Sequence, residues 1–121
     1  MHLQESGEMY LETIYRLSRE HEYVRSIDVA EEMGYSKPSV SRAVSLLRQG
    51  GYLLTAAHGY LALTDVGREV AQKIFARHTV LTKMRAALGV DQETAAEDAC
   101  RIEHVISDRT FEAIKQHLHR I

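Results

Sequence analysis

Two short segments with helical periodicity, each closed by glycine, constrain the fold of this chain more than any other feature. The first covers residues 27–33, with Ser26 as a plausible N-cap and Gly34 where a helix commonly ends in the left-handed region. The second begins at once at Ser36, another capping residue, and stops at Gly50. Two such helices joined by a three-residue turn predict a helix-turn-helix, whose second helix presents its N-terminal residues to the DNA major groove.

The residues that follow predict a wing for this motif. Residues 52–55 and 60–64 are rich in leucine, tyrosine and threonine, and the short segment 56–59 between them favours a turn. A helix-turn-helix pattern alone is also compatible with plain core packing, whereas an added β-hairpin favours a DNA-binding unit. We therefore expect a winged helix-turn-helix domain over residues 1–63.

The charge distribution supports a DNA-binding surface in this region. The formal net charge is -2, but the stretch from Met33 to Thr64 contains no Asp or Glu and carries three basic residues. Local positive charge matters more than the total for docking a polyanion. The predicted DNA contacts are Arg25, Ser36, Lys37, Pro38, Ser39, Ser41, Arg42, Arg48 and, at the tip of the wing, His58.

Helical patterns occupy most of the remaining chain. One helix is expected over about 5–20, and others over about 65–88, from Asp91 through a stripe ending at Ile106, and over 109–121. Residues 64–121 thus predict an all-α second domain with too few residues to build a large core alone. Burial against a second copy would supply the missing contacts, so we expect a homodimer.

One short sequence in this second domain predicts a metal site. Cys100, Glu103 and His104 recur at i, i+3 and i+4, the spacing that places side chains on one face of a helix. Thiolate, carboxylate and imidazole are transition-metal ligands. A chance polar face is the alternative, in which Cys100 is simply buried.

Other classes of protein are disfavoured. The chain has 121 residues, which is short for a large enzyme, and its single cysteine cannot form an internal disulfide. No apolar run approaches the roughly 18 residues that span a bilayer, and residues 1–6 lack a basic and then apolar signal sequence. We therefore expect a cytoplasmic protein with no membrane partner.

Several segments together resemble the diphtheria toxin repressor family. They are Gly7-Glu8-Met9-Tyr10-Leu11-Glu12-Thr13-Ile14-Tyr15, the winged helix, Arg77-His78, and Cys100-Arg101-Ile102-Glu103-His104-Val105-Ile106-Ser107-Asp108. The resemblance spans almost the whole chain in order. It implies a dimeric transcription regulator, not an enzyme, that binds operator DNA when Fe(II) or Mn(II) is present and has no small-molecule substrate.

The resemblance also implies a set of metal ligands. The iron-responsive branch is matched by Met9, Cys100, Glu103 and His104, and the manganese-responsive branch by Glu12 and His78. In the manganese branch Met9 would be Asp and Cys100 would be Glu. Considered one at a time, these residues have ordinary explanations: Met9 as an apolar contact, Glu12 as part of a solvated helix face and His78 as a packed or capping histidine.

The sequence also departs from the family pattern. Thr82 and Ala96 stand where the iron branch has the Glu and His ligands of an ancillary site, and the sequence stops before the SH3-like domain that some members carry. The resemblance therefore implies a short form without the ancillary iron site.

The predicted ligands indicate which metal is bound, and they leave two other functions open. Sulfur from Met9 and Cys100 favours iron over the all-oxygen sites of Mg(II) and Ca(II), while Zn(II), Co(II) or Ni(II) is plausible in vitro because it binds at least as tightly. Two other functions stay open at this point: a small metalloenzyme such as a hydrolase, and a winged-helix regulator that does not depend on metal.

Overall fold

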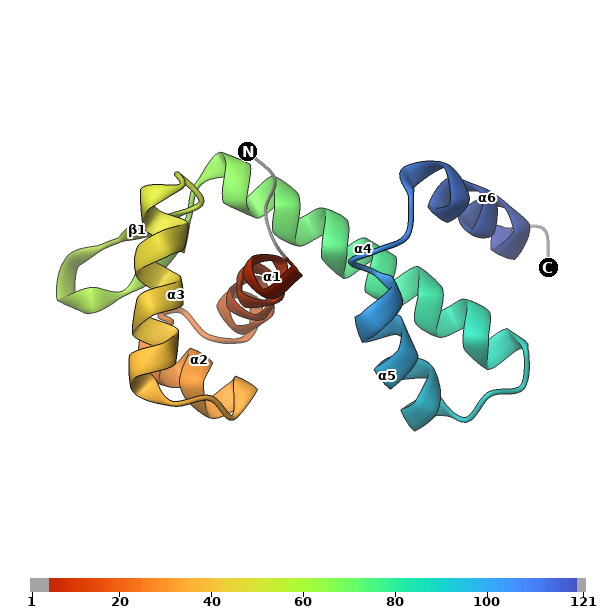
Figure 1. Ribbon diagram of the computed structural model, residues 1–121, viewed down its shortest axis with the longest axis horizontal. Helices are drawn as coiled ribbons and strands as arrows, with labels where there is room; N and C mark the ends of the chain where they lie inside the picture. The colour runs from red at the N-terminus through yellow and green to blue at the C-terminus, as the bar shows by residue number, and fades with distance from the viewer. Residues whose placement is uncertain (1–4, 120–121) are drawn as a thin grey trace. The chain divides into compact units, whose positions relative to one another are not determined.

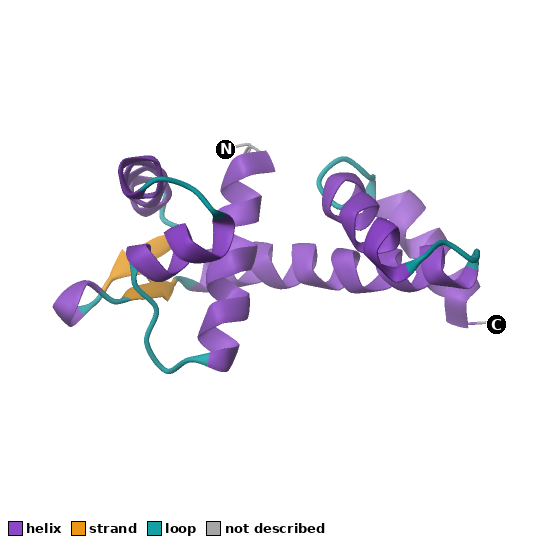
Figure 2. Cartoon of the chain, turned by 90° about the horizontal axis from the view of Figure 1, so that it is seen from below, coloured by secondary structure: helices purple, strands orange, loops and turns teal. Residues whose placement is uncertain are grey.

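The computed structural model describes residues 5–119 and divides the chain into two compact units. One unit ends at Gln72 and the other begins at Lys73, so the division falls inside a long helix, α4 (Asp65–Ala87) (Figure 1). Among the described residues, strands occur only in one short hairpin, and the predicted mainly α class is confirmed (Figure 2).

The N-terminal unit is a winged helix-turn-helix. It contains α1 (Glu5–Glu20), α2 (Ser26–Met33) and α3 (Lys37–Gln49), followed by the antiparallel strands β1 (Leu53–Thr55) and β2 (Leu61–Leu63). A single 3-10 turn, η1 (Ala57–Gly59), joins the strands, and the first turns of α4 complete the unit. These bounds confirm the predicted order of three helices and a wing.

Local capping explains most of these boundaries. Gly34 ends α2 with a φ of 71°, and the Ser36 hydroxyl accepts a hydrogen bond from the Ser39 N–H at the start of α3. The predicted Ser26 cap of α2 is wrong, because Ser26 is already helical and Arg25 is the N-cap residue. The carboxylate of Asp28 accepts a hydrogen bond from the Arg25 N–H at 2.8 Å, so an acidic side chain in the first turn takes the place of a serine cap.

The core of this unit packs α1 against the helix-turn-helix. Apolar side chains of α1 pack with those of α2, α3 and both strands in one buried cluster. Because α1 and α3 share this cluster, a displacement of α1 has to be accommodated by α3. The buried members are Tyr10, Leu11, Ile14, Leu17, Val24, Val29, Ala30, Val40, Val44, Leu47, Tyr52, Leu53, Leu61 and Ala71.

The C-terminal unit is helical throughout its described part, apart from turns. It consists of the rest of α4, α5 (Gln92–Ile102) and α6 (Asp108–His119). The Asp91 carboxylate caps α5 and the Ser107 hydroxyl accepts from the Thr110 N–H at the start of α6. Residues 120 and 121, which the sequence assigned to the last helix, lie outside the described part. The buried apolar side chains of this unit are Ile74, Leu81, Ala95, Ala99 and Phe111.

The predicted extension of α5 through Ile106 is wrong. The helix ends at Ile102, and the Val105 N–H donates to the Ile102 carbonyl three residues back, a tighter turn than in an α-helix, while the Ile106 N–H donates to the same carbonyl. Glu103 and His104 therefore lie in the turn that follows α5, although the Glu103 N–H still donates to Ala99 as in a helix. No helix of residues 5–119 has the length and apolar character needed to cross a bilayer.

Candidate metal centre and DNA-binding surface

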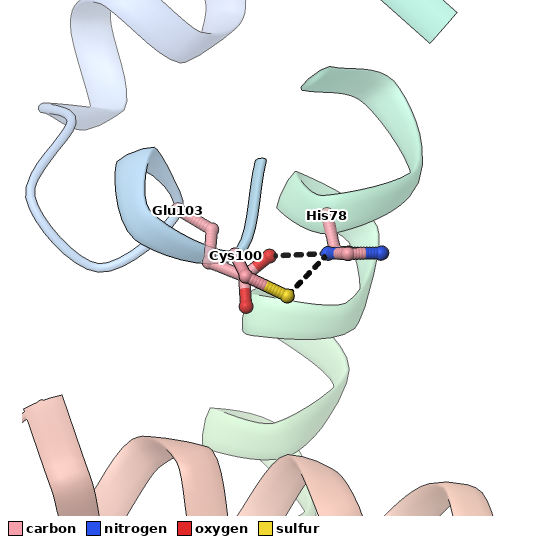
Figure 3. Close-up of side chains that lie close together, drawn as sticks. All are labelled: His78, Cys100 and Glu103. Carbon is pink, nitrogen blue, oxygen red and sulfur yellow. Dashed lines mark hydrogen bonds and ion pairs between the residues drawn. The ribbon is translucent and has the colours of Figure 1, made fainter. Parts of the chain in front are cut away.

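Three side chains of the C-terminal unit bring donor atoms of three kinds together. Nδ1 of His78, on α4, lies 2.8 Å from Oε2 of Glu103 and 3.7 Å from Sγ of Cys100, on α5 (Figure 3). The Cys100 and Glu103 side chains both point toward the His78 ring. All three ligand atoms lie within 4.8 Å of one another. An ion bound at about 2.0–2.3 Å holds its ligands about 3–4 Å apart, so this spacing fits a metal site.

The carboxylate of Glu103 also approaches a second imidazole. Its Oε1 lies 3.4 Å from Nε2 of His104, while its Oε2 contacts His78. Glu103 is only 1% exposed and the His104 side chain is fully buried. A carboxylate with two imidazoles is a ligand set that first-row divalent metals accept, and a neighbouring thiol adds a softer donor. The described residues thus place Glu103 beside three other predicted ligands, His78, Cys100 and His104.

A buried arginine holds the turn that carries Glu103. Nη1 of Arg77 donates to the main-chain oxygen of Glu103 at 3.0 Å, and its Nη2 donates to Oδ1 of Asp108 at the start of α6. Arg77 is 6% exposed and its guanidinium lies 5.7 Å from the centre of the Phe111 ring. Since the end of a helix leaves carbonyl groups without helical partners, Arg77 supplies a donor for the carbonyl of the residue that follows α5.

Asp108 is the anionic partner in this arrangement. Its carboxylate lies 3.1 Å from Nζ of Lys73 and accepts the hydrogen bond from Arg77. These hydrogen bonds, from Lys73 first and then Arg77, hold the pKa of the Asp108 carboxyl below its ordinary value. The carboxylate is mostly exposed, so solvent screens part of this interaction.

The two remaining predicted ligands belong to the N-terminal unit. Met9 and Glu12 lie on α1, where the Met9 carbonyl accepts a hydrogen bond from the Thr13 hydroxyl and Glu12 forms an ion pair with Arg16 at 3.7 Å. Metal binding by Met9 and Glu12 stays a prediction.

The predicted DNA contacts lie on α3, in the turn of the hairpin, or directly before α2 or α3. All of them are exposed except Ser39, which is half-buried. The Ser36 hydroxyl donates to the Ser39 hydroxyl at 2.8 Å in addition to capping α3, so these two serines are partly engaged with each other. Lys37, Ser41 and Arg42 are exposed along α3.

Two of the predicted basic contacts also fix the wing. Nη1 of Arg48, near the end of α3, donates to the Thr55 hydroxyl on β1 at 3.0 Å. The guanidinium of Arg25 lies 4.9 Å from the centre of the Tyr60 ring and donates to its hydroxyl at 3.3 Å. His58 lies in η1 with a φ of 64°, so the predicted tip position is confirmed while its contact with DNA stays a prediction.

Sequence reasoning missed Arg77 as part of the site. Its position offers a signal, because Arg77 falls three residues after Ile74 and four before Leu81, both buried on α4. A charged residue on the apolar stripe of a helix must be paired, so a partner in the second domain could have been expected. The sequence does not reveal which partner that is.

Comparison with known proteins decides the family. Residues 2–61 match the model of the iron dependent repressor N-terminal DNA binding domain, and residues 64–121 match the iron dependent repressor metal binding and dimerisation domain. The chain belongs to the iron-dependent repressor family. The predicted resemblance is therefore confirmed, and the winged helix and the donor cluster lie in the regions matched to DNA binding and to metal binding and dimerisation, respectively.

Individual members of the iron-dependent repressor family are similar over most of this chain. The HTH-type transcriptional regulator MntR of Bacillus subtilis is 33% identical over 109 residues, which are 90% of this chain and 77% of that protein. The iron-dependent repressor IdeR of Mycobacterium tuberculosis is 35% identical over 107 residues, 88% of this chain and 46% of IdeR. A manganese-dependent transcriptional repressor solved with manganese superposes with a TM-score of 0.84 at 28% identity, covering 93% of this chain and 52% of that one. This chain thus spans about half the length of the latter two.

Proposed function

We propose that this protein is a homodimeric, metal-dependent transcription regulator that represses genes of metal homeostasis by binding operator DNA. The observation that carries the proposal is the convergence of His78, Cys100 and Glu103 inside the region matched to metal binding and dimerisation. The proposal also requires a surface that can bind DNA, and α3, which carries exposed residues and no Asp or Glu, lies in the region matched to DNA binding. Such a regulator acts in the cytoplasm, where its DNA is.

Fe(II) or Mn(II) is the expected cofactor, and when bound it supplies positive charge that offsets the negative charge of its ligands. His78, Cys100, Glu103 and His104 are the residues that would hold it, and this chain is similar both to a solved manganese-dependent repressor and to an iron-dependent repressor. The sulfur of Cys100 favours iron over manganese, whereas Zn(II), Co(II) and Ni(II) are expected to bind at least as tightly in vitro. Thr82 and Ala96 offer no carboxylate or imidazole for an ancillary site.

The coupling to DNA is expected to act through α1. Met9 and Glu12 on that helix are predicted ligands, and α1 shares its apolar core with α3. A metal that restrains α1 would therefore also restrain α3. It would thereby restrain the spacing of the two winged helices in a dimer. A coupling free energy of about 1–3 kcal/mol would change operator affinity by about 5- to 150-fold.

Selection of DNA sequences by the full-length protein tests this function. We expect a sequence to be enriched with Mn(II), or with Fe(II) under anaerobic conditions, and not with a chelator. Glu103→Gln should abolish the metal effect, while Glu112→Gln, a matched change of an exposed residue on α6, should retain it. Enrichment that is equal with and without metal would support a metal-independent regulator, and no enrichment under any condition would return the metalloenzyme to consideration.

A further inference from the structure

We propose that Leu46 of α3 contributes to operator sequence preference by packing against the C5 methyl group of a thymine, about two base-pair steps from a guanine that Arg42 contacts. The inference rests on the proposed function, because it assumes that α3 enters the major groove. It adds a residue that charge and hydrogen-bonding patterns do not single out. It also predicts a feature of the DNA sequence itself.

The exposure of Leu46 is the starting observation. α3 buries Val40, Val44 and Leu47 in the core of its unit, yet Leu46 is 67% exposed. Among the large apolar side chains described in the N-terminal unit, none has a larger exposed fraction. A single exposed leucine is common on protein surfaces, so its neighbours on the helix decide whether it has a binding role.

Leu46 shares its helix face with Arg42. Residues at i and i+4 lie one above the other on an α-helix, and Arg42 is also exposed. No acidic residue occurs between Met33 and Thr64, so α3 and the wing carry no carboxylate of their own to repel phosphate. Charge complementarity therefore favours a polyanion over an apolar protein surface as the molecule that covers Leu46.

The chemistry of the major groove gives each residue a target. Arginine pairs bidentately with N7 and O6 of guanine, and the C5 methyl of thymine is an apolar group that a leucine can cover. Four residues of α-helix rise about 6 Å, and base pairs are about 3.4 Å apart, so the two contacts are separated by about two base-pair steps. Each half-site is expected to contain a guanine and a thymine at about this separation.

Base analogues test the contact directly with the full-length protein and Mn(II). In the selected operator, each thymine is replaced in turn by uracil, which removes only the methyl group, and each guanine by 7-deazaguanine, which removes N7. One uracil position per half-site should weaken wild-type binding by roughly fourfold, the value for burying one methyl-sized group. A 7-deazaguanine about two pairs away should weaken it by about fivefold or more.

The variants then assign the effects to residues. Leu46→Ala should bind the thymine and uracil operators equally, and Arg42→Ala should lose sensitivity to 7-deazaguanine. Leu54→Ala removes another exposed leucine, 58% exposed on β1, and should retain the full penalty for uracil. Leu46→Met, which keeps an apolar side chain, should retain most of the loss of affinity that uracil causes.

Two results separate the failure of this inference from the failure of the proposed function. If no thymine methyl matters to the wild type, or if Leu46→Ala keeps the uracil penalty, the Leu46 contact is wrong while metal-dependent DNA binding stands. If no sequence is selected under any metal condition, the proposed function is wrong and the Leu46 contact is wrong with it.

Discussion

Arg77 donates a hydrogen bond to the main-chain oxygen of Glu103, 26 residues later in the chain, at 3.0 Å. The same guanidinium donates to Asp108, so one buried side chain of α4 connects the end of α5 to the start of α6. Glu103 is the most buried carboxylate of the C-terminal unit, and its side chain contacts the imidazoles of His78 and His104. The geometry of the candidate metal centre therefore depends on a residue that offers no metal ligand itself.

Replacing this arginine should weaken both folding and metal binding. Arg77→Met leaves the buried Glu103 carbonyl without its donor, which should lower the free energy of unfolding by about 1–3 kcal/mol. Because outer residues that orient ligands affect affinity by about 10- to 100-fold, Mn(II) affinity should fall within that range. Urea denaturation and calorimetric titration measure the two effects. Lys83→Met, on the exposed surface of α4, should change neither, and equal behaviour of the two variants would contradict the role of Arg77.

The thiol of Cys100 should influence which metal is preferred. Cys100→Ser replaces a soft ligand by a harder one 3.7 Å from the His78 ring, so Co(II) affinity should fall by at least about tenfold and Mn(II) affinity by clearly less. The near-ultraviolet spectrum of the Co(II) form should also lose its thiolate charge-transfer absorption. Equal losses for both metals, or an unchanged cobalt spectrum, would show that Cys100 does not bind the metal.

Acid should destabilise the protein partly through Asp108. Its pKa is lowered in the folded state by Lys73 and Arg77, so its contribution is present above the ordinary carboxyl pKa and is lost as pH falls through the folded value. Unfolding by urea, compared between about pH 5 and pH 3, should therefore show a shallower loss of stability in Asp108→Asn than in the wild type. Identical pH profiles would contradict this contribution.

Gly67 should be intolerant of any side chain. A Cβ atom at this position, in the first turns of α4, would lie 2.0 Å from the Tyr52 carbonyl oxygen, which already accepts a hydrogen bond from the Thr64 N–H. Gly67→Ala should lower the free energy of unfolding by about 1–3 kcal/mol, despite the better helix propensity of alanine. Thermal unfolding measures this, with Glu69→Ala on the exposed face of α4 as the control. A gain in stability in Gly67→Ala would show that the close contact is relieved without cost.

Much of the fold could be predicted because its signals are local. The predicted bounds of α1 match the structure, and Ser36, Gly34 and Asp91 act as the caps and stops that their residue types indicate. The errors have two physical sources. At the start of α2, the Asp28 carboxylate accepts the capping hydrogen bond, and Ser26 is not the cap. At the end of α5, the Glu103 carbonyl accepts a hydrogen bond from Arg77, a residue distant in sequence.

The candidate site could be predicted only in part for the same reason. Cys100 and Glu103 are three residues apart, so their side chains lie close together even though α5 ends at Ile102, between them. His78 comes from another helix, and no periodicity relates it to Glu103; it entered the prediction through the family resemblance. Arg77 lies on the buried stripe of α4, but the identity of its partners depends on how α4, α5 and α6 pack, which the local pattern does not specify.

The reciprocal effect of operator DNA on metal affinity tests the coupling most directly. If Mn(II) strengthens operator binding, thermodynamic linkage requires the operator to strengthen Mn(II) binding by the same factor, expected at about 5- to 150-fold. Mn(II) affinity should be measured with the selected operator, with a scrambled duplex and without DNA, for the wild type and Glu103→Gln. We expect tighter binding only for the wild type with the operator. Equal Mn(II) affinity of the wild type under all three conditions would contradict metal control of DNA binding.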